Sequence, residues 1–98
     1  MLNIYKIRRT ADTWSFDVFD SAVVVAASAE DAAKTYPDAE SPILGAPFWN
    51  GTAWVYRRSQ QPMTNSAWVS PDEVTVTLIG TAAPGMEPQV VCSDYRGG

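Results

Sequence analysis

The sequence contains no histidine and a single cysteine, Cys92. Without histidine, the chain lacks the usual general base of serine and cysteine hydrolases and the commonest nitrogen ligand for metal ions. One cysteine cannot form a zinc–thiolate cluster, a Cys-x-x-Cys redox pair or a disulfide within the chain. Because Cys92 lies in an apolar segment, we expect a buried, inert thiol. The sequence therefore predicts no catalytic residue, no metal site and no cofactor, and it favours a reducing compartment, the cytoplasm.

Long apolar runs and positive charge are also scarce. The longest apolar run, residues 22–27, is far shorter than the roughly 20 residues of a membrane-spanning helix. Seven Lys and Arg against eleven Asp and Glu give a net charge of -4, which does not attract a phosphate backbone. No glycine-rich phosphate loop is present. We therefore expect neither membrane insertion nor general nucleic-acid binding.

The length and composition predict one folded domain spanning residues 1–98. The chain is 46% hydrophobic and 18% charged, which is enough apolar material for one core. A domain of this size buries only about two thirds of its unfolded-chain surface, so self-association into a homo-oligomer, or a partner, would add useful stability. Residues 95–98, which end in two glycines, are predicted to form a flexible C-terminal tail.

Patterning predicts an α+β fold with a single short helix packed on one face of an antiparallel or mixed sheet of about four to six short strands. The unbroken β-branched segment 21–27 is typical of a central strand covered on both faces. Ser28, followed by Glu30 and Asp31, predicts a helix start, and Pro37 ends that helix. The other expected strands cover residues 2–9, 14–19, 52–57, 74–79 and 89–93, with an ordered loop at 38–51, a mobile loop at 58–66 and a single turn at 70–73.

Aromatic residues are numerous for this length, with four Trp, four Tyr and three Phe. A core this small cannot bury all of them, and Trp, Tyr and Arg dominate the binding hot spots of protein interfaces. The predicted partner-binding surface therefore comprises the following residues near the middle of the chain: Trp49, Trp54, Tyr56, Arg57 and Arg58. The alternative is that Trp54, together with Trp14, belongs to the core.

Two arginine doublets, Arg8-Arg9 and Arg57-Arg58, suggest a second feature. If they met across adjacent strands, their guanidinium groups would form a patch for an anion or an acidic partner. The alternative is that each doublet is a solvated strand end.

Residues 23–33, 68–74 and 78–82 resemble segments of small proteins encoded by bacteriophages and prophages. These segments carry a strand entering a capped helix and a capped turn entering a strand, with no catalytic residue to transfer. The resemblance implies a context similar in character to anti-CRISPR and other anti-defence inhibitors, which bind and block a host protein in the bacterial cytoplasm. No specific inhibitor family matches.

The sequence and this resemblance together favour a non-enzymatic phage or prophage accessory protein that binds and inhibits a host bacterial protein. One alternative is a protein that binds or sequesters a small anionic ligand or nucleotide signal, with aromatic residues lining the pocket and arginines holding the anion. Another is a minor structural component of the virion.

Overall fold

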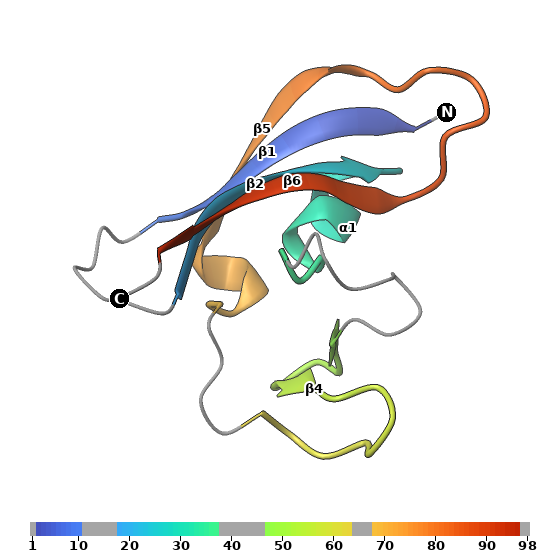
Figure 1. Ribbon diagram of the computed structural model, residues 1–98. Coiled ribbons are helices and arrows are strands. Elements are labelled where there is room, and N and C mark those ends of the chain that lie inside the picture. The colour runs from blue at the N-terminus through green and yellow to red at the C-terminus, as the bar shows by residue number, and fades with distance from the viewer. Residues whose placement is uncertain (1, 11–17, 38–46, 64–67, 97–98) are drawn as a thin grey trace.

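The computed structural model describes residues 2–10, 18–37, 47–63 and 68–96. The described residues form mostly β-sheet with one short helix (Figure 1). This broadly agrees with the predicted α+β class. The elements, in chain order, are β1 Asn3–Arg9, β2 Val18–Ala26, α1 Ala29–Ala33, β3 Phe48–Trp49, β4 Trp54–Val55, a single 3-10 turn Pro71–Glu73, β5 Val74–Thr81 and β6 Gln89–Arg96.

The main sheet has four strands in the order β5-β1-β2-β6, and every neighbouring pair is antiparallel. The expected central strand is confirmed as β2, although it begins earlier, at Val18, and continues through a register shift near Asp20. Residues 14–17 of the expected second strand lie outside the described residues. Since β5 and β6 occupy the two edges, the segment between them passes the ends of β1 and β2 (Figure 1).

The two faces of this sheet differ in what covers them. Tyr5 and Ile7 of β1 point to one face, where they pair with Val24 and Ala22 of β2, and all four are buried. This covered face packs against Ala32 of α1. The opposite face, called the outer face below, carries the intervening residues of each strand, as the alternation of side chains along a strand requires.

Helix α1 begins as the sequence predicts. The Ser28 Oγ accepts a hydrogen bond from the Asp31 backbone N–H at 3.1 Å, and Glu30 and Asp31 occupy the first turn. The helix ends at Ala33, before the expected end at Pro37, and Tyr36 therefore lies in irregular chain after it. Tyr36 is nevertheless buried, and its ring meets Phe19 edge to face at 5.9 Å.

A second, two-stranded sheet of β3 and β4 lies on the same side of the main sheet as α1 (Figure 1). An isolated bridge between Thr35 and Phe48 connects it to the chain after α1. Trp54 of β4 and Trp68 belong to the same core cluster as Tyr5 and Ile7. The aromatic side chains of this region thus fill the space beneath the sheet that the short helix leaves open.

The C-terminal strand corrects one expectation. The predicted tail at 95–98 does not begin at Tyr95, because Tyr95 and Arg96 belong to β6 and pair with Phe19 and Val18. The Tyr95 ring lies 5.0 Å from that of Phe19, a cross-strand aromatic pair that extends the strand. Residues 97–98 lie outside the described residues.

Candidate functional site

The β3–β4 hairpin turns at Asn50 and Gly51, the pair that the sequence marks as a turn. The Asn50 Oδ1 accepts hydrogen bonds from the backbone N–H groups of Thr52 at 2.9 Å and Ala53 at 2.8 Å. Gly51 adopts a φ of 108°, a conformation that side-chain-bearing residues rarely take. The loop expected over 38–51 therefore ends in a defined strand and turn, whereas residues 38–46 lie outside the described residues.

A second turn follows β4 and holds the arginine doublet. The Tyr56 N–H donates to the Gln61 carbonyl at 3.0 Å, and the Gln60 N–H donates to the Tyr56 carbonyl at 2.9 Å. The Met63 N–H returns to the Trp54 carbonyl at 2.8 Å, so the chain doubles back on β4. Of the mobile loop predicted over 58–66, residues 58–63 form this hydrogen-bonded turn, and their mobility stays a prediction. Residues 64–66 lie outside the described part of the chain.

Trp54 fastens this hairpin to the body of the protein. Its side chain is 4% exposed, and its Nε1 donates to the Val69 carbonyl at 2.8 Å. Its ring lies edge to face with Tyr36 at 5.2 Å and with Trp49 at 5.4 Å. Trp54 is therefore a core residue, as the alternative interpretation holds, and it offers no surface to a partner.

Of the remaining predicted contact residues, Tyr56, Arg57 and Arg58 lie on the outside of the hairpin, whereas Trp49 pairs with Trp54 and packs partly against the core cluster. Tyr56 is 49% exposed, Arg57 and Arg58 are exposed, and Trp49 is partly buried. The Arg57 guanidinium lies over the Phe48 ring, 5.0 Å from its centroid. We call Trp49, Tyr56, Arg57 and Arg58 the hairpin surface. The structure brings these four residues onto one small element.

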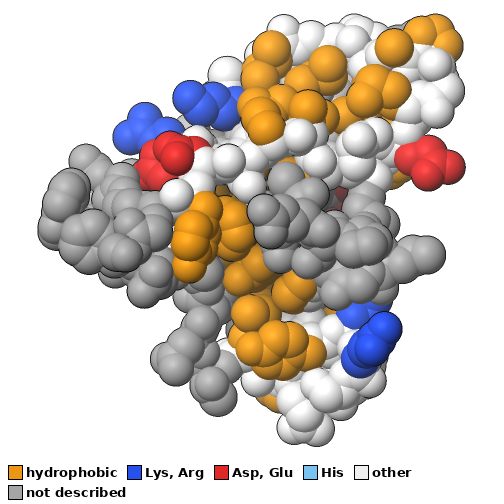
Figure 2. All heavy atoms as spheres, in the orientation of Figure 1, with side chains coloured by type: hydrophobic (Ala, Val, Ile, Leu, Met, Phe, Trp, Pro, Cys, Tyr) orange, Lys and Arg blue, Asp and Glu red, His pale blue; other side chains and the backbone are white. Residues whose placement is uncertain are grey.

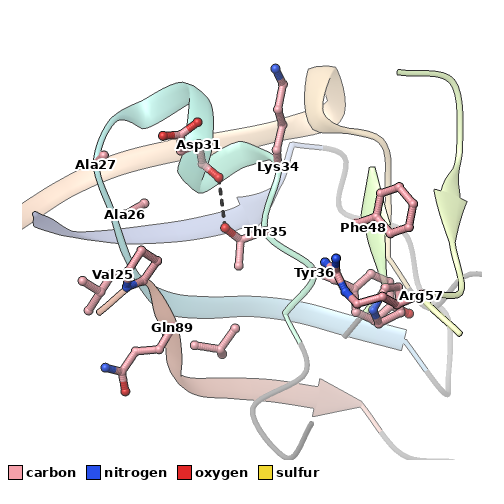
Figure 3. Close-up of a pocket in the computed structure, with 13 residues that line it drawn as sticks. Val25, Ala26, Ala27, Asp31, Lys34, Thr35, Tyr36, Phe48, Arg57 and Gln89 are labelled. Atoms are coloured by element: carbon pink, nitrogen blue, oxygen red, sulfur yellow. Dashed lines mark hydrogen bonds between the residues drawn. The ribbon is translucent and has the colours of Figure 1, made fainter. Parts of the chain in front are cut away.

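A cavity of about 270 Å³ lies beside this surface. It is bounded by the end of α1, the first residues of β6 and the hairpin, and Figure 3 shows Arg57 next to Tyr36 and Phe48 at its margin. Lys34 also lines the cavity, but its amine extends away from it and pairs with Glu30 at 3.0 Å (Figure 3). Arg57 is therefore the cation at the cavity margin that also belongs to the hairpin surface.

Sequence reasoning missed the contributions of α1 and β6 to this cavity. Thr35, whose Oγ1 donates to the Asp31 carbonyl at 2.9 Å, and Gln89 both line it. Neither residue belongs to a recognisable motif, and they meet only because β6 pairs with β2 beside the helix. No local pattern in the sequence could have indicated this meeting.

The two arginine doublets do not meet. Arg9 donates from its Nε to the Phe19 carbonyl at 2.6 Å and lies over the Trp68 ring, whereas Arg8 is exposed on the outer face. β1 pairs with β2 and β5 in the main sheet, whereas Arg57 and Arg58 lie in the turn that follows β4 of the second sheet. The expectation that the two doublets form one patch is wrong, because it required their strands to be neighbours in one sheet. Which strands become neighbours depends on contacts between distant parts of the chain.

Cys92 corrects a further expectation, since it is exposed on β6 rather than buried. Within the described ranges, no group of three or more His, Cys, Asp or Glu residues is placed to hold a metal ion. None of the described helices is long and apolar enough to cross a membrane.

Comparison with known proteins gives no relative. No protein-family model, curated protein or solved structure matches the chain. The geometry of the hairpin and its surroundings is therefore what indicates a function.

Proposed function

We propose that this chain is a non-enzymatic binding protein that engages a protein partner through the hairpin surface. The observation that carries the proposal is the contrast in burial between neighbouring residues of one short segment. Trp54 is fixed in the core, while Tyr56, Arg57 and Arg58 immediately after it are exposed. Aromatic and arginine side chains held in this way are the residue types that dominate binding hot spots.

Order in the hairpin lowers the cost of binding. The turn after β4 is closed by backbone hydrogen bonds from Tyr56 and Gln60, and the Gln60 Nε2 donates to the Arg57 carbonyl at 2.7 Å. A partner that meets a preordered element loses less conformational entropy than one that must order a loop. The adjacent cavity of about 270 Å³ gives space for one side chain of the partner.

Charge indicates the chemistry of the partner. Residues 47–63 contain two arginines and no Asp or Glu, although the whole chain carries a net charge of -4. The hairpin is therefore a basic element on an acidic protein, and an acidic protein surface complements it. In the setting that the phage-like segments imply, this partner is a host bacterial protein, and the chain acts by occupying its surface.

The test is co-purification with matched variants. Tagged wild-type chain is expressed in a bacterial host that carries defence systems, beside Tyr56→Ala/Arg58→Ala and the control Glu87→Ala. Arg58 is chosen over Arg57 because the Arg57 guanidinium also packs on Phe48, so its loss would loosen the hairpin. Glu87 is exposed and lies outside the hairpin.

We expect one host protein to co-purify in stoichiometric amount with the wild type and with Glu87→Ala, and to be lost with Tyr56→Ala/Arg58→Ala. Equal recovery with the hairpin variant would place the contact elsewhere. Recovery of no stoichiometric protein by any of the three chains would overturn the proposal. Recovery of the chain in purified virus particles would support a structural role instead.

A second candidate function uses the cavity itself. A space of about 270 Å³ with Arg57 at its margin suits a small anionic ligand such as a nucleotide signal. A ligand present at about 100 times its dissociation constant would stabilise the fold by about 2.7 kcal/mol, which a thermal-shift panel of nucleotides would detect. A shift that Arg57→Met abolishes and Arg58→Met retains would favour this function over the first, because methionine keeps an unbranched stem beside Phe48 and removes only the charge.

A further inference from the structure

Strand β5 forms one edge of the main sheet and lacks the features that usually protect such an edge. Its eight residues include no charged residue and no proline, whereas β6, at the other edge, carries the charged residue Asp94. Charged side chains and proline are common means of stopping an edge strand from pairing with another chain. Leu78 is 62% exposed and Ile79 is 56% exposed. Figure 2 shows hydrophobic side chains gathered in the upper part of the view, where Figure 1 places β5.

The register shows which backbone groups of β5 point away from the sheet. The Thr10 N–H donates to the Glu73 carbonyl at 2.9 Å, so these two residues form a hydrogen-bonded pair at the start of the β1–β5 ladder. Hydrogen-bonded and non-hydrogen-bonded pairs alternate along antiparallel strands. Counted from Glu73, every second residue up to Thr77 therefore bonds to β1. The N–H and C=O groups of Val76 and Leu78 point the other way, to the open edge.

These outward groups are available to another strand. Outside the sheet ladders, no backbone hydrogen bond joins Val76 or Leu78 to another described residue. Val74, which belongs to the same row, already donates its N–H to the Pro71 carbonyl. Val76 and Leu78 thus each offer one donor and one acceptor along the edge.

We propose that a second copy of this chain pairs with β5 through its own β5, antiparallel, about a twofold axis that is perpendicular to the sheet and passes beside Thr77. Each copy's Val76 then lies opposite the partner subunit's Leu78. Both of these pairs are hydrogen-bonded pairs, so the outward N–H and C=O groups of both residues all find a partner. The interface is isologous, and the two main sheets become one continuous sheet.

The side chains of β5 are complementary to themselves about this axis. A twofold axis perpendicular to the sheet joins like faces, so Thr77, which pairs with Lys6 on the outer face, meets the partner subunit's Thr77. Cross-strand threonine pairs are favourable. On the covered face, Val76 meets the partner subunit's Leu78, and Leu78 is 62% exposed without it. A second copy therefore satisfies the backbone of this edge and covers its most exposed side chain.

Neighbouring registers fit the edge less well. A shift by two residues in one direction would place Leu78 opposite the partner subunit's Val74. Because the Val74 N–H is bonded to the Pro71 carbonyl, the Leu78 carbonyl would then have no donor. A shift in the other direction would place Val76 opposite Gly80, which lies beyond the register shift of β5. The backbone thus favours the axis beside Thr77.

A cysteine placed at this axis tests both the dimer and its register. Cys92 is replaced in both variants, because it is exposed and could itself form a disulfide between copies. In Thr77→Cys/Cys92→Ser the two thiols belong to a non-hydrogen-bonded pair with Cα atoms about 4.5 Å apart, which a disulfide can bridge. The control Thr75→Cys/Cys92→Ser changes an exposed residue of the same strand and face. Its two thiols would be separated by about 14 Å along the strands, which is too far for a disulfide.

We expect sedimentation equilibrium of the wild type to show a mass that rises from one chain towards two between about 1 µM and about 1 mM. Under mild oxidation, Thr77→Cys/Cys92→Ser should become a disulfide-linked dimer, and the control should stay a single chain. A wild type that stays monomeric would overturn the proposal in favour of an extended segment of another protein at this edge. A wild-type dimer in which both cysteine variants cross-link equally, or neither does, would also overturn it, because another surface or register would then form the dimer.

Discussion

At the scale of single residues, two neighbouring aromatic side chains take opposite roles. Trp54 is 4% exposed and Tyr56 is 49% exposed, although residues two apart in a strand share a face. The reason is that β4 ends at Val55 and the chain turns at Tyr56. The residue types indicated that both aromatic side chains take part in packing or binding. Which of them is buried and which is exposed depends on where β4 ends, and the residue types do not show this.

The anchoring role of Trp54 is testable by removing its hydrogen bond while keeping a ring. Trp54→Phe leaves the Val69 carbonyl without its donor, and the loss of such a partly buried bond costs about 1 to 3 kcal/mol. We expect urea unfolding to show a decrease in stability of that size. Tyr56→Phe, at an exposed position, should change it by less than about 0.5 kcal/mol. Equal effects of the two substitutions would mean that Trp54 does not fasten the hairpin.

At the scale of elements, local signals predicted more than non-local ones. The alternation in β1 and β5 and the cap at Ser28 are short-range patterns, and the structure confirms these elements. The β3 strand and the turn after Tyr56 were missed because each is held by pairing with β4 rather than by its own composition. The expected meeting of arginine doublets failed for the same reason, since it required a pairing of strands that no local pattern specifies.

Two serines with similar sequence surroundings give a matched test at this scale. Ser28 caps α1 by accepting from a backbone N–H, whereas the Ser70 side chain makes no cap bond and instead donates to Asp72 and Glu73. Loss of a serine cap costs about 1 kcal/mol. Ser28→Ala should therefore lower the free energy of unfolding by about 1 kcal/mol, and Ser70→Ala by less than about 0.5 kcal/mol. The reverse order in chemical denaturation would show that the cap at Ser28 contributes little to stability.

At the scale of the whole molecule, the fold separates two surfaces. The hairpin lies on the covered side of the sheet with α1, and the outer face looks the other way (Figure 1).

The central claim is that the hairpin surface makes the functional contact, and a direct affinity measurement tests it. Calorimetric titration of the co-purified partner with wild type and with Tyr56→Ala/Arg58→Ala compares the two dissociation constants. Truncation of hot-spot residues costs about 2 kcal/mol each, so we expect binding to weaken by about 100-fold or more. Dissociation constants that agree to within about threefold would contradict the account, because exposed residues whose removal costs so little carry no binding energy.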